Sequence, residues 1–202
     1  MKFDFSRRGF CRNGLGAMLG ATLIPQTAFA LTDAEAKVLV NLVVDDINRV
    51  ISSGKPVSGM IQDFERIFRK YADVDIIARS TLGADARRIS ASQMAAYTKA
   101  FRGYIARKYG KRFNEFIGGR IEVNGAKKVK SWHEVISTAY LRGEPPFEVK
   151  FLVSDRSGRD LFFDMVIEGI SLRLSERTEI GAMLDQRNGD IDALIEDLRK
   201  AG

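Results

Sequence analysis

The sequence predicts a single α+β domain, with helices packed against one face of an antiparallel sheet. Three observations support this fold class. Apolar residues recur at helical spacing over residues 32–109, alternate with polar residues over 121–167, and return to helical spacing over 172–198. Helices, then strands, then helices again are typical of α+β architecture. The chain of 202 residues is long enough for one domain with a proper core.

We expect residues 1–30 to form a cleaved export signal and residues 31–202 to form the mature domain. Ser6-Arg7-Arg8-Gly9-Phe10 matches the twin-arginine pattern S-R-R-x-F, and a weakly apolar run over residues 14–24 follows. Ala28-Phe29-Ala30 then offers a small-x-small cleavage site. An ordinary secretory signal that happens to contain two arginines is the alternative. Because the run is shorter than the roughly 20 apolar residues of a membrane span, we expect a soluble periplasmic protein.

Cysteine content and charge exclude several functions. Cys11, the only cysteine, lies in the signal, so disulfides, thiol catalysis and cysteine-bound metals are not expected in the mature domain. The signal holds four basic residues and one acid, a net charge of +3, which leaves +3 of the total +6 for the domain. This modest charge and the predicted export argue against nucleic acid as a partner.

The first predicted helix begins with a capping box formed by Thr32 and Glu35, and it ends at Gly54-Lys55-Pro56. A second helix carries its apolar residues over 61–71, and a short third helix spans 74–82. Each of these segments places its apolar side chains on one side, so each is expected to cover the sheet or another helix.

A second capping box, Ser90 with Gln93, opens a long helix. One side of this helix is aromatic or apolar, with Tyr97, Phe101, Tyr104, Ile105 and Tyr109. Such a stripe either belongs to the core or lines a ligand cavity, and both can hold for different rings.

From Ile121 onward the apolar period is two, which predicts strands. Asn124-Gly125 predicts the first hairpin turn, followed by a strand from about Lys127 to Leu141. Two more strands cover 147–153 and 161–167. Three turns that join four strands describe an antiparallel meander.

Two predicted helices complete the domain after Gly169. The first carries Leu174 and Ile180 on its apolar side and ends at Asn188-Gly189. Asp190 then caps a final helix whose apolar residues recur at helical spacing over 191–198.

Catalytic motifs are scarce. His133 is the only histidine, so a site with several histidine ligands is excluded, and we expect it to be a solvated strand residue. No G-x-S-x-G, P-loop or G-x-G-x-x-G pattern is present. Asp164 and Glu168 lie on the same face of the last strand and are the best candidates for acid–base chemistry. The favoured interpretation makes Asp164 structural, paired with Arg177 or with backbone groups of the following helix.

Basic residues concentrate between Arg102 and Lys130, a segment that contains nine basic residues and only two acidic ones. This segment is either a solvated face or a docking face for anionic head groups or acidic partners. The residues expected to form the docking face are Lys108, Lys111, Arg112, Lys127 and Lys128.

Two segments resemble the MlaC family, the periplasmic phospholipid shuttles of the lipid-asymmetry system, also known as toluene-tolerance proteins. Asp164, Ile167-Glu168-Gly169, Ser171-Leu172 and Arg177 follow the family signature D-v-v-i-E-G-v-S-L…R. The second segment, with Ile76 to Gly83, Ser90 to Gln93, Ala100-Phe101-Arg102 and Tyr109, matches in the same order. Asp160 and Ile180 depart from the aromatic residues that many members have at these positions.

The resemblance implies a curved four-stranded sheet wrapped by helices, NTF2-like in outline, with a deep apolar cavity. It implies a monomeric, non-enzymatic carrier that encloses phospholipid acyl chains, with no cofactor or metal beyond this cargo. Its implied partners are an outer-membrane lipoprotein–porin complex and an inner-membrane ABC transporter with a substrate-binding ring. Two alternatives stay open: a carrier of another lipid such as a hopanoid, and a small periplasmic isomerase or hydrolase that uses Asp164 on an apolar substrate.

Acyl chains must be enclosed, because each exposed CH₂ costs about 0.8 kcal/mol and two chains reach roughly 20–25 kcal/mol. Two predicted strands, joined by the short turn over 155–158, each present an apolar face, so their side chains are expected to form one patch. A register slip of one residue would turn the other set inward. The expected lipid contacts are Val149, Phe151, Val153, Leu161, Phe163, Met165 and Ile167 of this patch, with Tyr104 and Ile105 from the covering helix.

Overall fold

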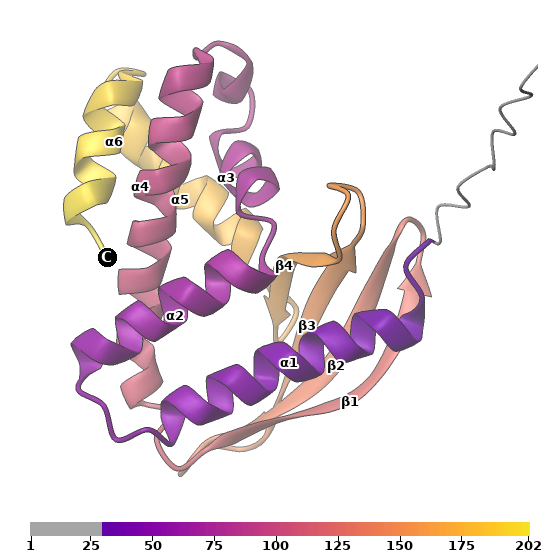
Figure 1. Cartoon of the computed structure of the whole chain (residues 1–202). Coiled ribbons are helices and arrows are strands. Elements are labelled where there is room, and N and C mark those ends of the chain that lie inside the picture. Colours follow the sequence, from indigo (N-terminus) through magenta and orange to yellow (C-terminus); the bar gives the residue numbers. More distant parts are fainter. Residues whose placement is uncertain (1–29) are drawn as a thin grey trace, which may run out of the picture.

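The computed structural model describes residues 30–202, apart from the side chains of residues 113 and 114 (Figure 1). The expected export signal, including its twin arginines, therefore lies outside the described residues. The helices are α1 (Asp33–Ile51), α2 (Val57–Tyr71), α3 (Val74–Leu82), η1 (Asp85–Arg87), α4 (Ala91–Gly110), η2 (Lys111–Asn114), α5 (Leu172–Gln186) and α6 (Ile191–Lys200). The strands are β1 (Arg120–Val129), β2 (Trp132–Tyr140), β3 (Phe147–Ser154), β4 (Leu161–Ile167) and β5 (Ile170–Ser171).

The strands form one open antiparallel sheet with the order β1-β2-β3-β4-β5. The predicted α+β class and the meander order are confirmed. The predicted strand number is wrong, because the sheet has five strands: after β4 the chain turns at Glu168-Gly169, where both residues have positive φ, and β5 pairs back onto Val166 and Ile167. The NTF2-like outline stays a prediction.

The predicted hairpin at Asn124-Gly125 is wrong. Both residues lie inside β1, at a bulge where the pairing with β2 shifts between Val123 and Gly125. The chain reverses instead after Val129, where Lys130 has a φ of 56°. A bulge and a tight turn both favour Asn and Gly, so the dipeptide alone does not distinguish them.

The helix ends agree with the predicted capping residues. Both capping boxes are formed, Thr32 with Glu35 at α1 and Ser90 with Gln93 at α4. Asp190 accepts hydrogen bonds from the backbone N–H groups of residues 192 and 193, at the start of α6. These ends were predictable because a cap is a contact between residues two or three positions apart.

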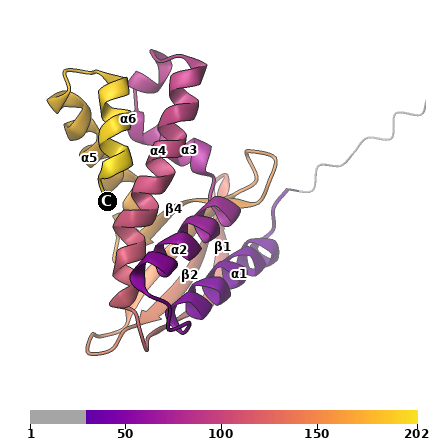
Figure 2. The same ribbon diagram turned by 60° about the vertical axis from the view of Figure 1, so that its left-hand side comes forward.

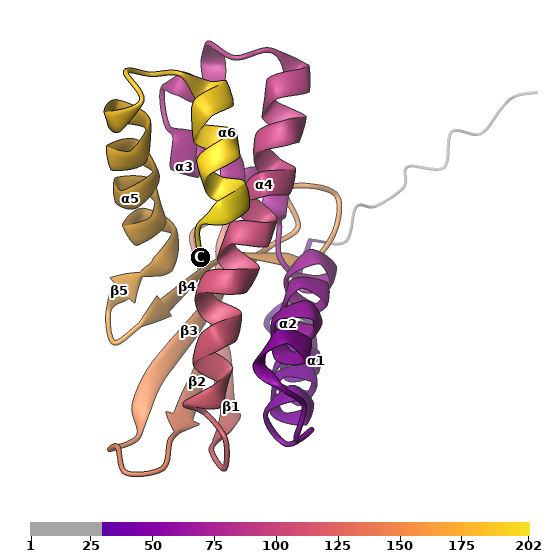
Figure 3. The same cartoon turned by 90° about the vertical axis from the view of Figure 1, so that its left-hand side faces the viewer.

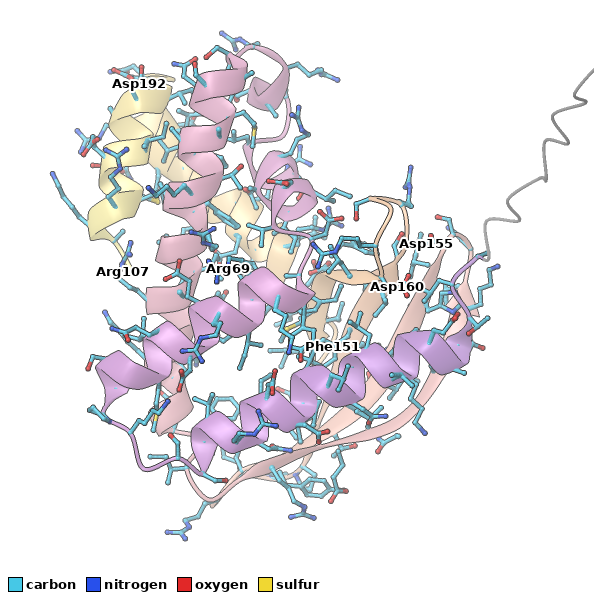
Figure 4. All side chains as sticks on the ribbon, viewed as in Figure 1. Arg69, Arg107, Phe151, Asp155, Asp160 and Asp192 are labelled. Atoms are coloured by element: carbon cyan, nitrogen blue, oxygen red, sulfur yellow. The ribbon has the colours of Figure 1, made fainter. Side chains whose placement is uncertain are left out.

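Helix α1 lies along the inner face of the sheet, where it contacts β1, β2 and β3 (Figure 1). It is joined to α2 by a short connection, and the two helices run side by side as a hairpin (Figure 2). Helices α3, α4, α5 and α6 gather at one end of the sheet, with α4 packed against α2 and α6 (Figure 3). Between these layers lies the main core, which includes the fully buried ring of Phe151 (Figure 4).

The prediction that His133 is a solvated strand residue is wrong. The residue is 4% exposed, and its Nδ1 lies 2.6 Å from a carboxylate oxygen of Asp33 in the first turn of α1. The histidine therefore connects the start of α1 to β2. Within residues 30–202, no helix combines the length and the hydrophobicity needed to cross a membrane.

Candidate functional site

A pocket of about 350 Å³ lies between the inner face of the sheet and helices α1, α2, α4 and α5. Side chains of β3 and β4 form one wall, including Val149, Phe151, Phe162, Met165 and Ile167. Apolar side chains of the helices form the other walls, including Val43, Ile47, Phe64, Phe68, Phe101 and Ile105. Small-molecule sites are typically mostly apolar pockets of about 300–1,000 Å³, so size and lining fit a ligand site.

A second bulge determines which side chains of β4 face the pocket. Asp164 pairs with Leu152, whereas Phe162 pairs with Val153, so Phe163 is an extra residue between them. Because an inserted residue reverses the alternation of side chains, Phe162 takes the inward place that was predicted for Phe163. The ring of Phe162 packs against that of Phe151, with the centroids 5.7 Å apart.

The prediction that Leu161, Phe163, Met165 and Ile167 share one face is therefore wrong. Met165 and Ile167 lie opposite Phe151 and Val149, as expected from their register. The ring of Phe163 instead meets Trp132 edge to face, with the centroids 6.3 Å apart.

Six of the nine expected lipid contacts line the pocket: Ile105, Val149, Phe151, Phe163, Met165 and Ile167. The other three, Tyr104, Val153 and Leu161, are buried but are not among its lining residues. Contact of any of them with lipid stays a prediction. The pocket lining contributed by α1 and α2 was not predictable, because apolar residues at helical spacing look the same whether they face a core or a ligand.

The aromatic stripe of α4 divides between core and pocket. Tyr97 is fully buried and shares a hydrogen bond of 2.7 Å with Thr81, and burial raises the pKa of its hydroxyl. Phe101, Ile105 and Tyr109 line the pocket. The stripe therefore belongs in part to the core and in part to the pocket wall, and its contact with a ligand stays a prediction.

Asp164 holds the end of β4 to the start of α5. It is 4% exposed, and its Oδ1 accepts hydrogen bonds from the backbone N–H groups of Met165 and Arg173, at 2.8 and 3.0 Å. Its Oδ2 accepts a hydrogen bond of 2.6 Å from the Ser171 hydroxyl and lies 3.5 Å from the Nε of Arg173. The expected connection between strand and helix is confirmed, although the acid reaches Ser171 and Arg173 instead of Arg177.

Arg177 lies one turn further along α5 than Arg173, and its guanidinium group faces α3. A Cβ built at Gly83 would lie 3.0 Å from one of its terminal nitrogens. Gly83 also has a φ of 60°, which favours glycine, so this position accommodates both the end of α3 and the arginine.

A polar network joins α4 to α5 beside the pocket. Lys108 donates hydrogen bonds to Glu176 and Glu179, at 2.8 and 2.5 Å. Tyr109 donates to Glu176 at 2.5 Å, and Tyr104 donates to Glu179 at 2.6 Å. Burial, followed by these hydrogen bonds to carboxylates, raises the pKa of both tyrosines.

The lysine of this network stays charged. Burial by itself would lower the pKa of Lys108, but its hydrogen bonds to Glu176 and Glu179 outweigh this and raise it. Two carboxylates thus share one ammonium group, and the two hydroxyls remain neutral donors.

Two basic residues of the segment between Arg102 and Lys130 are engaged within the domain. Lys108 belongs to the α4–α5 network, and Arg107 donates hydrogen bonds to the carbonyls of Leu198 and Ala201. Lys127 and Lys128 lie at the far end of β1, opposite Glu134 and His133. A docking face formed by all five residues stays a prediction.

No group of three or more acidic, histidine or cysteine side chains in the described part of the chain is arranged to hold a metal ion. The site is instead an apolar pocket with charged groups on its α5 side. Fold and pocket together define a small α+β ligand-binding domain.

The chain belongs to the MlaC protein family, whose model matches residues 40–200. Among solved structures, it is similar to a phospholipid-binding protein from Ralstonia solanacearum in complex with a phospholipid. The two share 17% sequence identity with a TM-score of 0.70, over 82% of this chain and 95% of that chain. No curated protein sequence gives a significant match.

Proposed function

We propose that this protein is a periplasmic carrier that encloses the acyl chains of a phospholipid in the pocket between the sheet and helices α1, α2, α4 and α5. The observation that carries the proposal is the lining of this pocket, where Phe151, Phe162 and Met165 of the sheet face apolar side chains of the helices. Membership of the MlaC family and the phospholipid-binding protein of the same fold support it.

An apolar pocket suits this task for an energetic reason. Two acyl chains that leave a membrane would expose surface at a cost of roughly 20–25 kcal/mol, at about 0.8 kcal/mol per CH₂. Contact with a surface groove recovers only part of this free energy, whereas enclosure between a sheet and helices removes the chains from water on all sides.

The carrier is proposed to exchange lipid with two membrane complexes. These are an outer-membrane lipoprotein–porin complex and an inner-membrane ABC transporter with a substrate-binding ring, as the family resemblance implies. The protein is proposed to act as a monomer, after export directed by residues 1–30.

An enzymatic role for Asp164 is the competing function, and its hydrogen bonds argue against it. Both carboxylate oxygens already accept hydrogen bonds, from two backbone N–H groups and from Ser171. These three hydrogen bonds occupy three of the roughly four acceptor positions of the carboxylate, which leaves little capacity to take a substrate proton as a general base must. The carrier function therefore explains this residue better, as a structural group.

Mass spectrometry of an organic extract of the purified protein tests the proposal. We expect close to one phospholipid per protein molecule, recovered from the folded fraction. An extract dominated by a hopanoid would identify a carrier of another lipid, and an extract without any lipid would contradict the carrier function. Transfer of labelled phospholipid between vesicles bearing the two membrane complexes then tests shuttling, with vesicles lacking either complex as the control.

A further inference from the structure

The start of α1 is fastened to the sheet by residues that directly follow the expected cleavage site. Leu31 is 7% exposed and belongs to the hydrophobic core, whereas the preceding residue, Ala30, is exposed. The backbone N–H of Leu31 donates a hydrogen bond of 3.1 Å to Oδ2 of Asp155, in the turn between β3 and β4. Two positions further on, Asp33 contacts His133 of β2. The first buried side chain in the described part of the chain is therefore that of the residue which cleavage would make the N-terminus.

The backbone nitrogen of Leu31 lies in an acidic corner formed by Glu35, Asp155 and Asp160. Asp155 and Asp160 lie at the same end of the molecule, close to the start of the described chain (Figure 4). The pKa of Asp160 is raised by burial and then by the negative charges of Glu35 and Asp155, so the three carboxylates are close enough to repel one another. Within residues 30–202, neither Asp155 nor Asp160 forms an ion pair with a basic side chain. The acidic corner therefore has a place for a cation.

Cleavage by a signal peptidase would supply this cation. The carbonyl carbon of Ala30 takes the oxygen of a water molecule, the C–N bond to Leu31 breaks, and both protons of the water end on the nitrogen of Leu31. The resulting α-amine has an ordinary pKa of about 8, so it is mostly protonated at neutral pH. An uncharged N–H donor is thus replaced by an ammonium group on the atom that already donates to Asp155.

The balance of charges favours the ammonium at this position. The dipole of α1 opposes a cation near the start of the helix, but it corresponds to only about half a unit charge. Glu35, Asp155 and Asp160 offer three carboxylates on the other side of the balance. The turn that holds Asp155 is half-buried, where opposite charges attract more strongly than they do in bulk water.

We infer that removal of residues 1–30 completes the acidic corner: the new α-ammonium group of Leu31 pairs with Asp155 and fastens the start of α1 to the turn between β3 and β4. The processed domain is then more stable than the same domain with an uncharged nitrogen at Leu31. Helix α1 also carries Val43 and Ile47 of the pocket wall, so this contact helps to hold one wall in place. The inference rests on the proposed export of the chain, and it is independent of whether the pocket binds lipid.

The position of the new N-terminus is the first test. The full-length sequence is expressed in a bacterial host, the protein is purified from the periplasm, and its intact mass is measured. We expect a chain that begins at Leu31. A protein that keeps residues 1–30, or that is cut at any other bond, overturns the inference, because the nitrogen of Leu31 is then either an amide or absent.

Acetylation of the processed protein then isolates the charge. An N-acetylated Leu31 keeps one N–H donor but loses the positive charge. The α-amine can be modified selectively near neutral pH, because lysine side chains have a much higher pKa of about 10.4, and peptide mapping verifies that they are unmodified. We expect the free protein to melt about 2–4 °C above the acetylated one, as measured by thermal unfolding. Equal melting temperatures overturn the inference, whatever lipid the protein carries.

A variant assigns the effect to one carboxylate. In Asp155→Asn the difference in melting temperature between the free and acetylated forms is expected to fall to near zero, because an amide cannot form an ion pair. Asp45→Asn, at an exposed position of α1, makes the same chemical change and is expected to keep the full difference. An Asp155→Asn protein that keeps the full difference contradicts the assignment. The comparison of free and acetylated wild-type protein needs no variant, so it remains decisive if Asp155→Asn impairs folding.

Discussion

Met165 allows a residue-scale test of whether the wall of β4 encloses lipid or a packed core. Met165 lines the pocket and is half-buried, so a carboxylate there can be hydrated when the pocket holds no lipid. Met165→Glu is therefore expected to give folded protein that carries no phospholipid. Circular dichroism and lipid extraction measure the two properties on the same sample.

Val153 provides the matched control on the neighbouring strand. It is 0% exposed and is not among the pocket-lining residues, so a carboxylate there would be buried without a partner. Val153→Glu is expected to unfold the domain, because an uncompensated buried charge costs several kcal/mol. If Met165→Glu stays folded and retains a full complement of lipid, the lipid does not contact this wall.

Asp164 is predicted to contribute to stability through its negative charge. The carboxylate accepts hydrogen bonds from two backbone N–H groups and from Ser171. Asp164→Asn keeps the shape of the side chain but replaces one acceptor oxygen with a donor, so at least one of these hydrogen bonds is lost. We expect a loss of about 2–4 kcal/mol in the free energy of unfolding, measured by urea denaturation. Asp192→Asn, at an exposed site on α6, is expected to change it little. Unchanged stability together with the loss of a turnover activity would favour the enzymatic alternative.

At the scale of elements, the contact between α2 and α4 depends on Gly110. A Cβ at this position would lie 2.9 Å from the Cα of Ile61, so two backbones would have to separate. Alanine is the better helix former, yet Gly110→Ala is expected to destabilise the protein by about 1–3 kcal/mol through this overlap.

Gly103, in the same helix, is the control for this prediction. A Cβ there would approach only Nη1 of the Arg107 side chain, at 3.1 Å, and no backbone atom of a neighbouring element. Gly103→Ala is expected to be neutral or to stabilise the protein by up to about 1 kcal/mol. Thermal unfolding of both variants provides the comparison, and equal melting temperatures would show that α2 and α4 tolerate a wider spacing.

The helices were predictable from the sequence because their signals are local. Thr32, Ser90 and Asp190 each cap a helix through neighbours two or three positions away. The strands were less predictable, because bulges depend on the partner strand. The bulge near Val123 could not be distinguished from a turn in the sequence, so the first turn was placed too early. The bulge in β4 places Phe162 on the inner face, where Phe163 was predicted.

At the scale of the whole molecule, the residues of the candidate site also divide into those with local sequence signals and those that depend on distant contacts. Its strand residues Val149, Phe151, Met165 and Ile167 were predictable from alternation along one strand pair. The walls from α1 and α2 were not, because their position depends on packing between elements that are distant in sequence. The polar network of Glu176 was missed for the same reason, since Lys108 is 68 residues away.

Export of the whole chain is the last property that the sequence predicts. Arg7-Arg8 and Ala28-Phe29-Ala30 motivate export in a folded state by the twin-arginine route. Replacing both arginines with lysine keeps the positive charge but removes the paired guanidinium groups. We expect uncleaved precursor to accumulate in the cytoplasm, measured by fractionation and immunoblotting. The control is Lys2→Arg, which leaves the pair intact and should be processed normally. If the double-lysine protein is processed and exported as efficiently as the wild type, the signal is an ordinary secretory one and the domain crosses the membrane unfolded.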